Sequence, residues 1–239
     1  MNQPGFFEII GFGPNGWGPA LLAATGMTIA VAICGFLLGA VIGALGAWAK
    51  LSGGPITRRL ADGYTTVLRG IPDLLVIYLF YFGSSAVLTP LGRLFGATGF
   101  ISLPGFLAGA LAIGVVSGAY HTEVFRGAYR AVSRGEIEAA IACGMSPFLR
   151  LRRIIAPLVL RYALPGLGNV WQLVLKETAL ISVTGLVEIL RQAQIGAGST
   201  RQPFTFFFIA AILYLVISSV SGWGLRAAET RFTRGLRRA

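Results

Sequence analysis

The chain has 239 residues, of which 55% are hydrophobic and 12% are charged, and its mean hydropathy is +0.74. This composition leaves too little polar surface for a soluble domain of that size, so the sequence predicts an integral membrane protein. The formal net charge of +11 could suit a nucleic-acid partner, but the basic residues lie between apolar stretches, which argues against one.

Five apolar stretches reach the roughly 20 residues that a helix needs to cross a membrane. In chain order, we predict spans at residues 20–49, 72–92, 94–120, 162–187 and 202–225. Residues 1–19 form an outer segment before them, and residues 226–239 form a basic tail after them. The spans occupy most of the chain. We therefore expect an all-α protein with a single membrane domain, residues 20–225.

The basic residues are distributed unevenly between the two sides of these spans. If the N-terminus is outside, most Lys and Arg residues fall in inner segments, while Arg93, Arg191 and Arg201 remain outside. An excess of Lys and Arg marks the cytoplasmic side of a membrane protein. The sequence therefore predicts an N-terminus outside and a C-terminus inside.

Glycines recur at short intervals in two of the predicted spans. They are Gly35, Gly39 and Gly43 in the first span, and Gly105, Gly109, Gly114 and Gly118 in the third. Small residues spaced in this way allow the backbones of membrane helices to approach closely. We expect these faces to be helix contacts, and a glycine-lined channel is the less favoured alternative.

The inner loop at residues 126–161 has the signals of a helix, a turn and a second helix. Ser133 followed by Glu136 has the spacing of a capping box, which predicts a helix starting near Arg134. Gly144 suits the left-handed position that ends such a helix, and Ser146 can cap the next one. These caps would also suit any cytosolic helical hairpin, so they do not by themselves identify a function.

A longer motif runs through the same loop. It has the spacing E-A-A-x3-G-x9-I-x2-P, formed by Glu138, Ala139, Ala140, Gly144, Ile154 and Pro157. This spacing resembles the cytoplasmic signature of the membrane subunits of bacterial ATP-binding-cassette importers. The resemblance implies that the loop couples the chain to a soluble ATPase. The small alanines would let the first helix enter a groove, and Glu138 would offer a charge for docking.

Other segments extend the likeness over most of the chain. They include Arg69-Gly70-Ile71-Pro72-Asp73, Phe125-Arg126-Gly127-Ala128 and Leu164-Pro165-Gly166. Together they resemble the permease subunits of polar amino acid importers in the histidine, lysine, arginine, ornithine and opine group. The resemblance implies a multi-pass protein of the bacterial inner membrane. Its implied partners are two ATP-binding cassette subunits, a second homologous permease or a copy of itself, a periplasmic solute-binding protein and an amino acid substrate.

The chain lacks the parts needed to hydrolyse ATP itself. Its two lysines, Lys50 and Lys176, follow Ala49 and Leu175, so there is no Gly-Lys phosphate loop. We expect ATP and Mg to bind the partner subunits, and we expect no cofactor on this chain. A single histidine and the lack of a His or Cys cluster predict no metal site, and no catalytic constellation suggests a membrane enzyme.

A polar arc near the middle of the fourth span is the candidate substrate pathway. Asn169, Gln172 and Lys176 fall on one helical face, with Glu177 beside them. Charges inside a membrane are costly and therefore tend to face a bundle interior or a wet cavity. One hypothesis is that Glu177 meets the cationic side chain of the solute. The alternative, weighted equally, is that Lys176 and Glu177 neutralise each other or a neighbouring helix.

The remaining charges have plainer interpretations. Asp73 follows Pro72 in the first turn of the second span, where a carboxylate favours the positive end of the helix dipole. Glu123 and Arg126 are three residues apart at the inner end of the third span and should pair.

An ion-driven carrier or a passive channel for small polar solutes would also be a basic five-span protein, and it stands as the alternative function.

Overall fold

The computed structural model describes residues 5–14, 16–96, 98–99 and 101–232, with the side chains of Phe6 and Phe7 excepted. The last seven residues of the predicted basic tail and the first four of the predicted outer segment lie outside this range. All regular secondary structure in the described part is helical.

The described chain contains both long and short helices. The helices before the inner loop are α1 (Phe6–Ile10), α2 (Gly18–Ser52), α3 (Pro55–Gly70), α4 (Asp73–Leu94) and α5 (Gly105–Ala131). The loop itself holds α6 (Arg134–Ala142), α7 (Pro147–Arg150) and a π-helical turn (Leu151–Ile155). The remaining elements are α8 (Ala156–Glu177), a 3-10 helix (Thr178–Thr184), α9 (Ile189–Thr200) and α10 (Pro203–Phe232).

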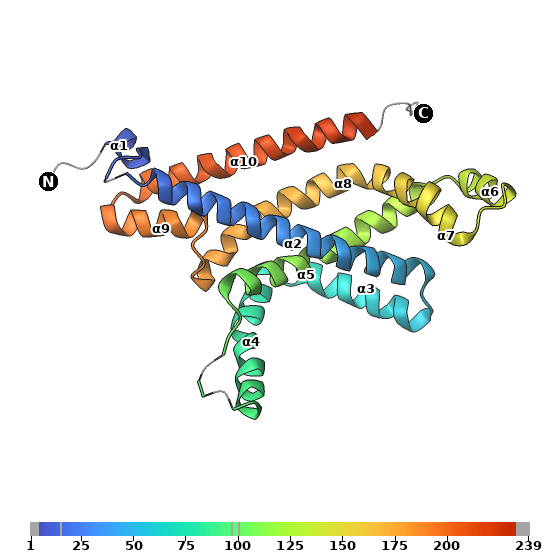
Figure 1. Cartoon of the computed structure of the whole chain (residues 1–239), viewed down its shortest axis with the longest axis horizontal. Helices are drawn as coiled ribbons and strands as arrows, with labels where there is room; N and C mark the ends of the chain where they lie inside the picture. The colour runs from blue at the N-terminus through green and yellow to red at the C-terminus, as the bar shows by residue number, and fades with distance from the viewer. Residues whose placement is uncertain (1–4, 15, 97, 100, 233–239) are drawn as a thin grey trace.

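Five of these helical runs are long and apolar enough to cross a membrane, which confirms the predicted fold class. They are α2, α4, α5, the continuous run Pro147–Thr184 and α10. Figure 1 shows α2, α5, α8 and α10 running along the length of the molecule, with α6 and α7 at one end and α9 near the other. The start of α2 and the end of α10 lie at opposite ends, as an odd number of spans requires.

The centre of the molecule is the contact between α2 and α5. A Cβ atom placed on Gly35 would meet Cγ2 of Ile113 at 2.6 Å, and Cβ atoms on Gly39 and Gly43 would collide with Ser117 and His121. The glycine face predicted for the first span is therefore a helix contact. A side chain larger than hydrogen at these positions would force the two helices apart.

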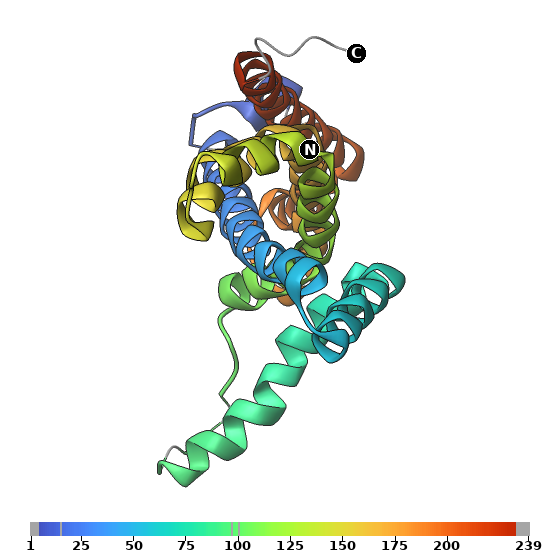
Figure 2. The same ribbon diagram turned by 90° about the vertical axis from the view of Figure 1, so that its right-hand side faces the viewer.

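By contrast, α4 projects away from this bundle. Figure 2 shows it leaving the four long helices at a steep angle, with α3 at its base. Its exposed side chains include Leu79 (70%), Phe82 (60%) and Val87 (64%). The described chain leaves most of the surface of these apolar side chains uncovered, so they must be covered by lipid or by another protein.

The structure differs from the predicted spans in several boundaries. The third span was expected from residue 94, but α5 begins at Gly105 because the chain turns through Gly96 and Gly99, both with positive φ, and Pro104 precedes the helix. The fourth span does not continue as an α-helix past Glu177, since the 3-10 helix follows and Gly185, with φ +83°, ends it. Neither α3 nor α9 was predicted.

Candidate coupling and substrate sites

The inner loop folds into the predicted helix-turn-helix, called here the coupling hairpin (residues 132–157). Ser133 has extended backbone angles and precedes α6 as expected, although its side chain makes no capping hydrogen bond. Gly144 adopts φ +72° after the helix end. The amides of Gly144 and Met145 donate to the carbonyls of Ile141 (2.9 Å) and Ala140 (3.1 Å). Gly144 therefore ends α6 by the left-handed turn that its sequence position predicts.

The second half of the hairpin continues directly into the membrane domain. Oγ of Ser146 accepts a hydrogen bond from the amide of Leu149 (3.4 Å), which confirms the predicted cap. The second helix is not a separate unit, because α7 passes through the π-helical turn into α8 without a break. Pro157 lies in the first turn of α8, where the wider π turn accommodates a residue without an amide hydrogen. A force on the hairpin would therefore be transmitted straight into α8.

Most of the motif residues line a single groove between α6 and the start of α8. Ala139, Ala140, Ile154 and Pro157 line it, and its volume is about 500 Å³. Glu138 and Gly144 are exposed beside it. The spacing of the motif thus has a geometric reason, since residues 14 to 18 positions apart face each other across the turn.

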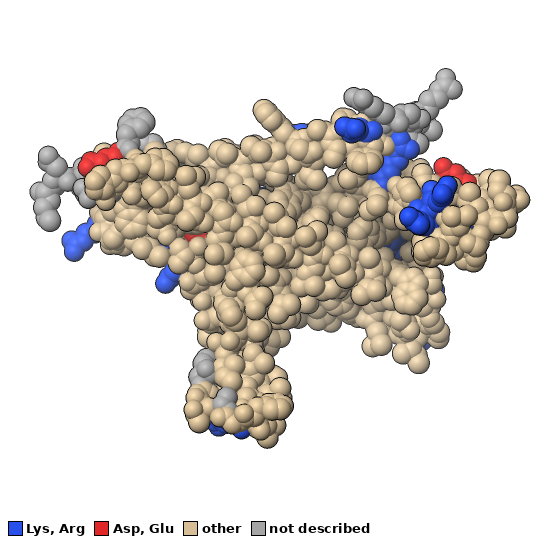
Figure 3. Space-filling view, viewed as in Figure 1, with Lys and Arg blue, Asp and Glu red and all other residues tan. Residues whose placement is uncertain are grey.

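The surface of the hairpin is open to solvent. Phe148 is 72% exposed and Ile141 is 52% exposed at the end of the molecule where α6 and α7 lie. Figure 3 shows Lys and Arg gathered at this end while the middle of the visible face is almost free of charge. A protruding hairpin that exposes large apolar side chains, with Lys and Arg residues around it, is suited to bind a soluble protein at the membrane surface.

The carboxylate of the predicted substrate pathway, Glu177, is buried. Glu177 is the last residue of α8 and is 5% exposed, and neither of its carboxylate oxygens accepts a hydrogen bond from an N–H or hydroxyl donor within the described chain. The charge that acts on it belongs to Asp73, in the first turn of α4. Asp73 therefore does more than complement a helix dipole, because it places a second acidic group beside a buried one.

An aromatic and a basic side chain surround this acidic pair. Tyr120 of α5 interacts electrostatically with both Asp73 and Glu177. The guanidinium carbon of Arg69 lies 5.4 Å from the centre of the Tyr120 ring. The acidic pair thus lies where α3, α4, α5 and α8 meet.

The other pathway residues point elsewhere. Lys176 is exposed, and no ion pair joins it to Glu177 in the described structure. Asn169 and Gln172 line a groove of about 410 Å³ between α8 and α10, where the side chain of Gln172 donates to the carbonyl of Ser218 (3.1 Å). Successive helical residues point about 100° apart, so Glu177 faces α4 while Gln172 faces α10. The four residues do not form one cluster.

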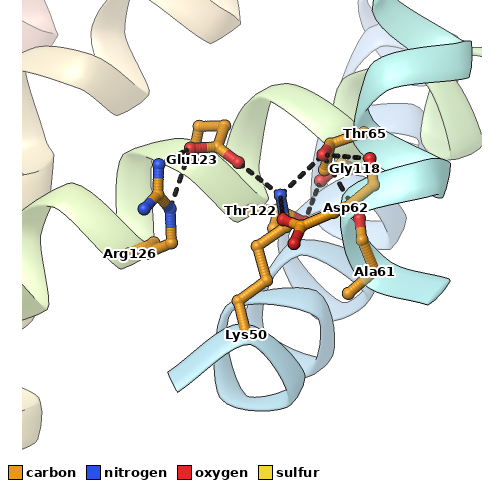
Figure 4. A network of polar contacts seen from close by, with 8 residues as sticks. All are labelled: Lys50, Ala61, Asp62, Thr65, Gly118, Thr122, Glu123 and Arg126. Atoms are coloured by element: carbon orange, nitrogen blue, oxygen red, sulfur yellow. Dashed lines mark hydrogen bonds and ion pairs between the residues drawn. The ribbon is translucent and has the colours of Figure 1, made fainter. Parts of the chain in front are cut away.

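Sequence reasoning missed the polar junction shown in Figure 4, which we call the Lys50 junction (Lys50, Asp62, Thr65, Glu123 and Arg126). Nζ of Lys50 donates to Oγ1 of Thr65 (2.6 Å) and pairs with Glu123 (2.7 Å) and Asp62 (2.8 Å). Nε of Arg126 donates to Glu123 (2.9 Å), which confirms that predicted pair. The junction fastens α3 to the packed pair α2 and α5. The one available signal was a lysine at the end of the first apolar span.

A second missed contact fixes α9. Glu188 is 1% exposed and accepts hydrogen bonds from the amides of Leu190 (2.9 Å) and Arg191 (2.7 Å), so it caps the helix. The hydroxyl of Tyr214 donates to the same carboxylate (2.9 Å) and ties the cap to α10. The start of α9 is thereby held against the body of α10.

Comparison with known proteins agrees with this geometry. A family model described as the binding-protein-dependent transport system inner membrane component matches residues 35–234. The octopine transport system permease protein OccQ of Rhizobium meliloti is 61% identical, over 98% of this chain and 99% of that protein. The histidine/lysine/arginine/ornithine transport system permease protein HisQ of Escherichia coli K12 is 39% identical, over 94% and 98%.

The fold also matches solved transporters. The crystal structure of an amino acid ABC transporter with histidines has a TM-score of 0.76 and 31% identity, and the match covers 90% of this chain and 95% of that one. Membership of this family excludes the ion-driven carrier or passive channel, because a binding-protein-dependent system has its own ATPase subunits and binding protein. The chain belongs to the inner-membrane permease subunits of ATP-binding-cassette importers, as the transport component and not the ATPase.

Proposed function

We propose that this permease carries a cationic amino acid, or a derivative of one, inward by alternating access. The single observation that carries the proposal is the buried carboxylate of Glu177, which lies beside the carboxyl group of Asp73 and accepts no hydrogen bond from an N–H or hydroxyl donor within the described chain. Similar permeases are named for octopine and for histidine, lysine, arginine and ornithine. A solute with a basic side chain would suit an acidic pair of this kind.

The physical argument is the cost of two neighbouring acids inside a membrane domain. Burial and mutual repulsion both disfavour two ionised carboxylates at close range. A cationic group placed between Glu177 and Asp73 would remove both penalties at once. A neutral solute would leave them in place, so the pair discriminates by charge.

The drive for transport would come through the coupling hairpin. We infer that an ATP-binding cassette subunit seats on Glu138 and the groove lined by Ala139, Ala140, Ile154 and Pro157. A second homologous permease, or a copy of this chain, would complete the pathway, with a second ATPase subunit below it and a periplasmic binding protein above. ATP and Mg would bind the ATPases. Closure of the ATPase dimer would move α8 through its direct continuity with α7 and rock the bundle.

The substrate assignment is tested in the reconstituted importer, with the ATPase and binding protein present. Uptake of radiolabelled arginine is measured in competition with a neutral amino acid for the wild type and for Glu177→Gln. The amide should reduce the preference for the cation by about tenfold, the equivalent of 1.4 kcal/mol. Lys176→Gln is the matched control, since Lys176 is the adjacent residue, is exposed and forms no ion pair with Glu177. Unchanged preference in Glu177→Gln would rule out a substrate role for this carboxylate.

The docking assignment has its own test. Co-purification of the ATPase with wild-type permease is compared with that of Glu138→Ala and of Glu8→Ala, the latter being an exposed acid far from the hairpin. Only Glu138→Ala should lower the amount of ATPase retained. Equal retention by both variants would count against Glu138 as a docking residue.

A further inference from the structure

A small basic pocket adjoins the Lys50 junction and is used by neither the coupling hairpin nor the acidic pair. Its volume is about 230 Å³, and it is lined by Lys50, Leu51, Arg58, Asp62, Arg126 and Arg130. Four cationic side chains therefore face one carboxylate. The pocket draws on three helices, with Lys50 at the end of α2, Arg58 at the start of α3 and Arg130 at the end of α5.

The cations of this pocket are not all used by the protein. Lys50 is paired with Asp62 and Glu123, and Arg126 is paired with Glu123. The side chains of Arg58 and Arg130 have no ion pair or hydrogen bond within the described part of the chain. Two guanidinium groups on different helices thus remain available to an anion. The guanidinium group is suited to two-point contact with phosphate oxygens.

The size and depth of the pocket indicate the kind of anion. A volume of about 230 Å³ is below the roughly 300–1,000 Å³ of pockets that enclose whole small molecules, so it suits a phosphate group with little attached to it. From Gly18 to Ala49, α2 contains no charged residue, and Lys50 is the first one. The pocket therefore lies where the apolar part of the helix ends, on the side of the molecule that carries the coupling hairpin.

An apolar groove begins directly beside the basic pocket. Leu51 lines both, and the groove, of about 540 Å³, continues along Trp48, Phe125, Val159 and Leu160. Trp48 is 66% exposed. A phosphate site and an apolar groove that share a residue at this depth match the two parts of a phospholipid, whereas a soluble phosphate would use only the first part.

We propose that this pocket binds the phosphate group of an anionic phospholipid from the cytoplasmic leaflet, with an acyl chain along the adjoining groove. The bound lipid would connect Arg58 of α3 to Arg130 of α5, four residues before the start of α6. It would therefore brace the helix that leads into the coupling hairpin. The proposal is independent of which solute the importer carries.

The test uses the assembled importer, stripped of lipid in detergent, and follows its thermal unfolding midpoint. Dioleoylphosphatidylglycerol is titrated in mixed micelles, with dioleoylphosphatidylcholine and inorganic phosphate as separate arms. Phosphatidylglycerol should raise the midpoint, and the other two should not. The variant pair Arg58→Gln with Arg130→Gln should raise the concentration of phosphatidylglycerol that gives half the effect by on the order of tenfold.

The matched control removes two positive charges outside the pocket. Arg59→Gln with Arg231→Gln changes the neighbour of Arg58 and an exposed arginine at the end of α10, and it should respond to phosphatidylglycerol like the wild type. Native mass spectrometry of the wild-type importer provides a second measurement that needs no variant, and it should show phosphatidylglycerol retained in preference to phosphatidylcholine. Three results would overturn the proposal: equal loss in both variant pairs, an equal effect of phosphatidylcholine, or an equal effect of inorganic phosphate at the same concentration.

Discussion

The neighbouring helices α5 and α4 differ sharply in how much of their surface is buried by other parts of the same chain. In the most apolar 18 residues of each, 67% of the residues of α5 are buried within the described molecule but only 11% of those of α4. The difference does not come from hydropathy, which is higher for α4 (1.8 against 1.3). It comes from glycine and alanine, which let α5 meet α2 and α8 closely, while α4 carries large apolar residues outward.

The coupling hairpin belongs with α4 in this comparison. Both project from the packed bundle and expose large apolar side chains such as Phe82 and Phe148. We infer that the packed pair of α2 and α5 forms a rigid frame. The exposed apolar surfaces of the projecting parts, α4 and the coupling hairpin, are covered by lipid or by other subunits. Substitutions in the frame should therefore act on stability, and those in the projecting parts should act on assembly and coupling.

The largest effect should follow from filling one of the closest glycine contacts between α2 and α5. Gly43→Val would place a branched side chain against Cβ of His121 and against the backbone of α5. We expect a loss of about 3 kcal/mol in the free energy of unfolding, measured as a lower thermal midpoint and less folded protein in detergent. In Gly83→Val, on α4, the new Cβ would meet its nearest atom, Cδ1 of Leu79, at an ordinary 3.6 Å. Similar losses in the two variants would break the distinction between frame and projecting parts.

Substitution of a glycine in the coupling hairpin should impair transport and leave the stability of the permease nearly unchanged. Gly144→Val forces a branched residue into φ +72°, at a local cost of about 1–2 kcal/mol. We expect the turn to shift and uptake per ATP hydrolysed to fall by about tenfold, with the thermal midpoint of the permease close to that of the wild type. Gly127→Val is the control, because its Cβ has open space and its backbone is helical. Normal uptake in Gly144→Val would argue against this turn as part of the transmission path.

The Lys50 junction tests how firmly α3 is joined to the frame. Lys50→Met removes the group that contacts Thr65, Asp62 and Glu123 together. Glu123 keeps its bond to Arg126, so the expected loss is moderate, about 1–2 kcal/mol in the free energy of unfolding. Arg59→Met removes an exposed cation of α3 without such contacts and should leave the thermal midpoint unchanged. If both variants unfold at the same temperature, the junction adds nothing to stability.

The features that sequence predicted well are those that depend on local pattern. Hydropathy located the long helices, and Gly144 with Ser146 marked the hairpin turn because caps act over a few residues. By contrast, α3 escaped notice because Arg58, Arg59 and Asp62 interrupt its apolar residues and lower its mean hydropathy. A helix of this kind is detected by the periodic spacing of its apolar residues and not by its mean hydropathy.

The features that sequence missed depend on contacts between distant parts of the chain. Lys50 and Glu123 are 73 residues apart, and the approach of Asp73 to Glu177 spans an even longer stretch. Composition and spacing cannot predict which charges meet when four helices pack. The same limit explains why Gln172 and Glu177 were assigned to one arc, since the division of α8 between α10 and α4 is set by tertiary packing.

The smallest effect should be a change in the acid sensitivity of the junction. The hydrogen bond from Lys50 lowers the pKa of the Asp62 carboxyl, against a smaller opposing effect of burial. The unfolded chain, with a carboxyl pKa of about 3.9, then binds this proton more readily than the folded one. The stabilising contribution is present above that value and is lost as the pH falls through the lower folded-state pKa.

Asp62→Asn should therefore flatten the fall in the thermal midpoint as the pH drops below about 4, because the amide cannot take up the proton. Glu8→Gln is the control, since Glu8 is an exposed acid without an ion pair in the described structure. Asp62 is itself largely exposed at its side chain (57%), so solvent screens the pair and the difference should be small. A curve for Asp62→Asn that is as steep as that of the wild type would mean that Lys50 is held by Glu123 and Thr65 alone. The attachment of α3 to the frame would then depend on the hydroxyl of Thr65 and not on the charge of Asp62.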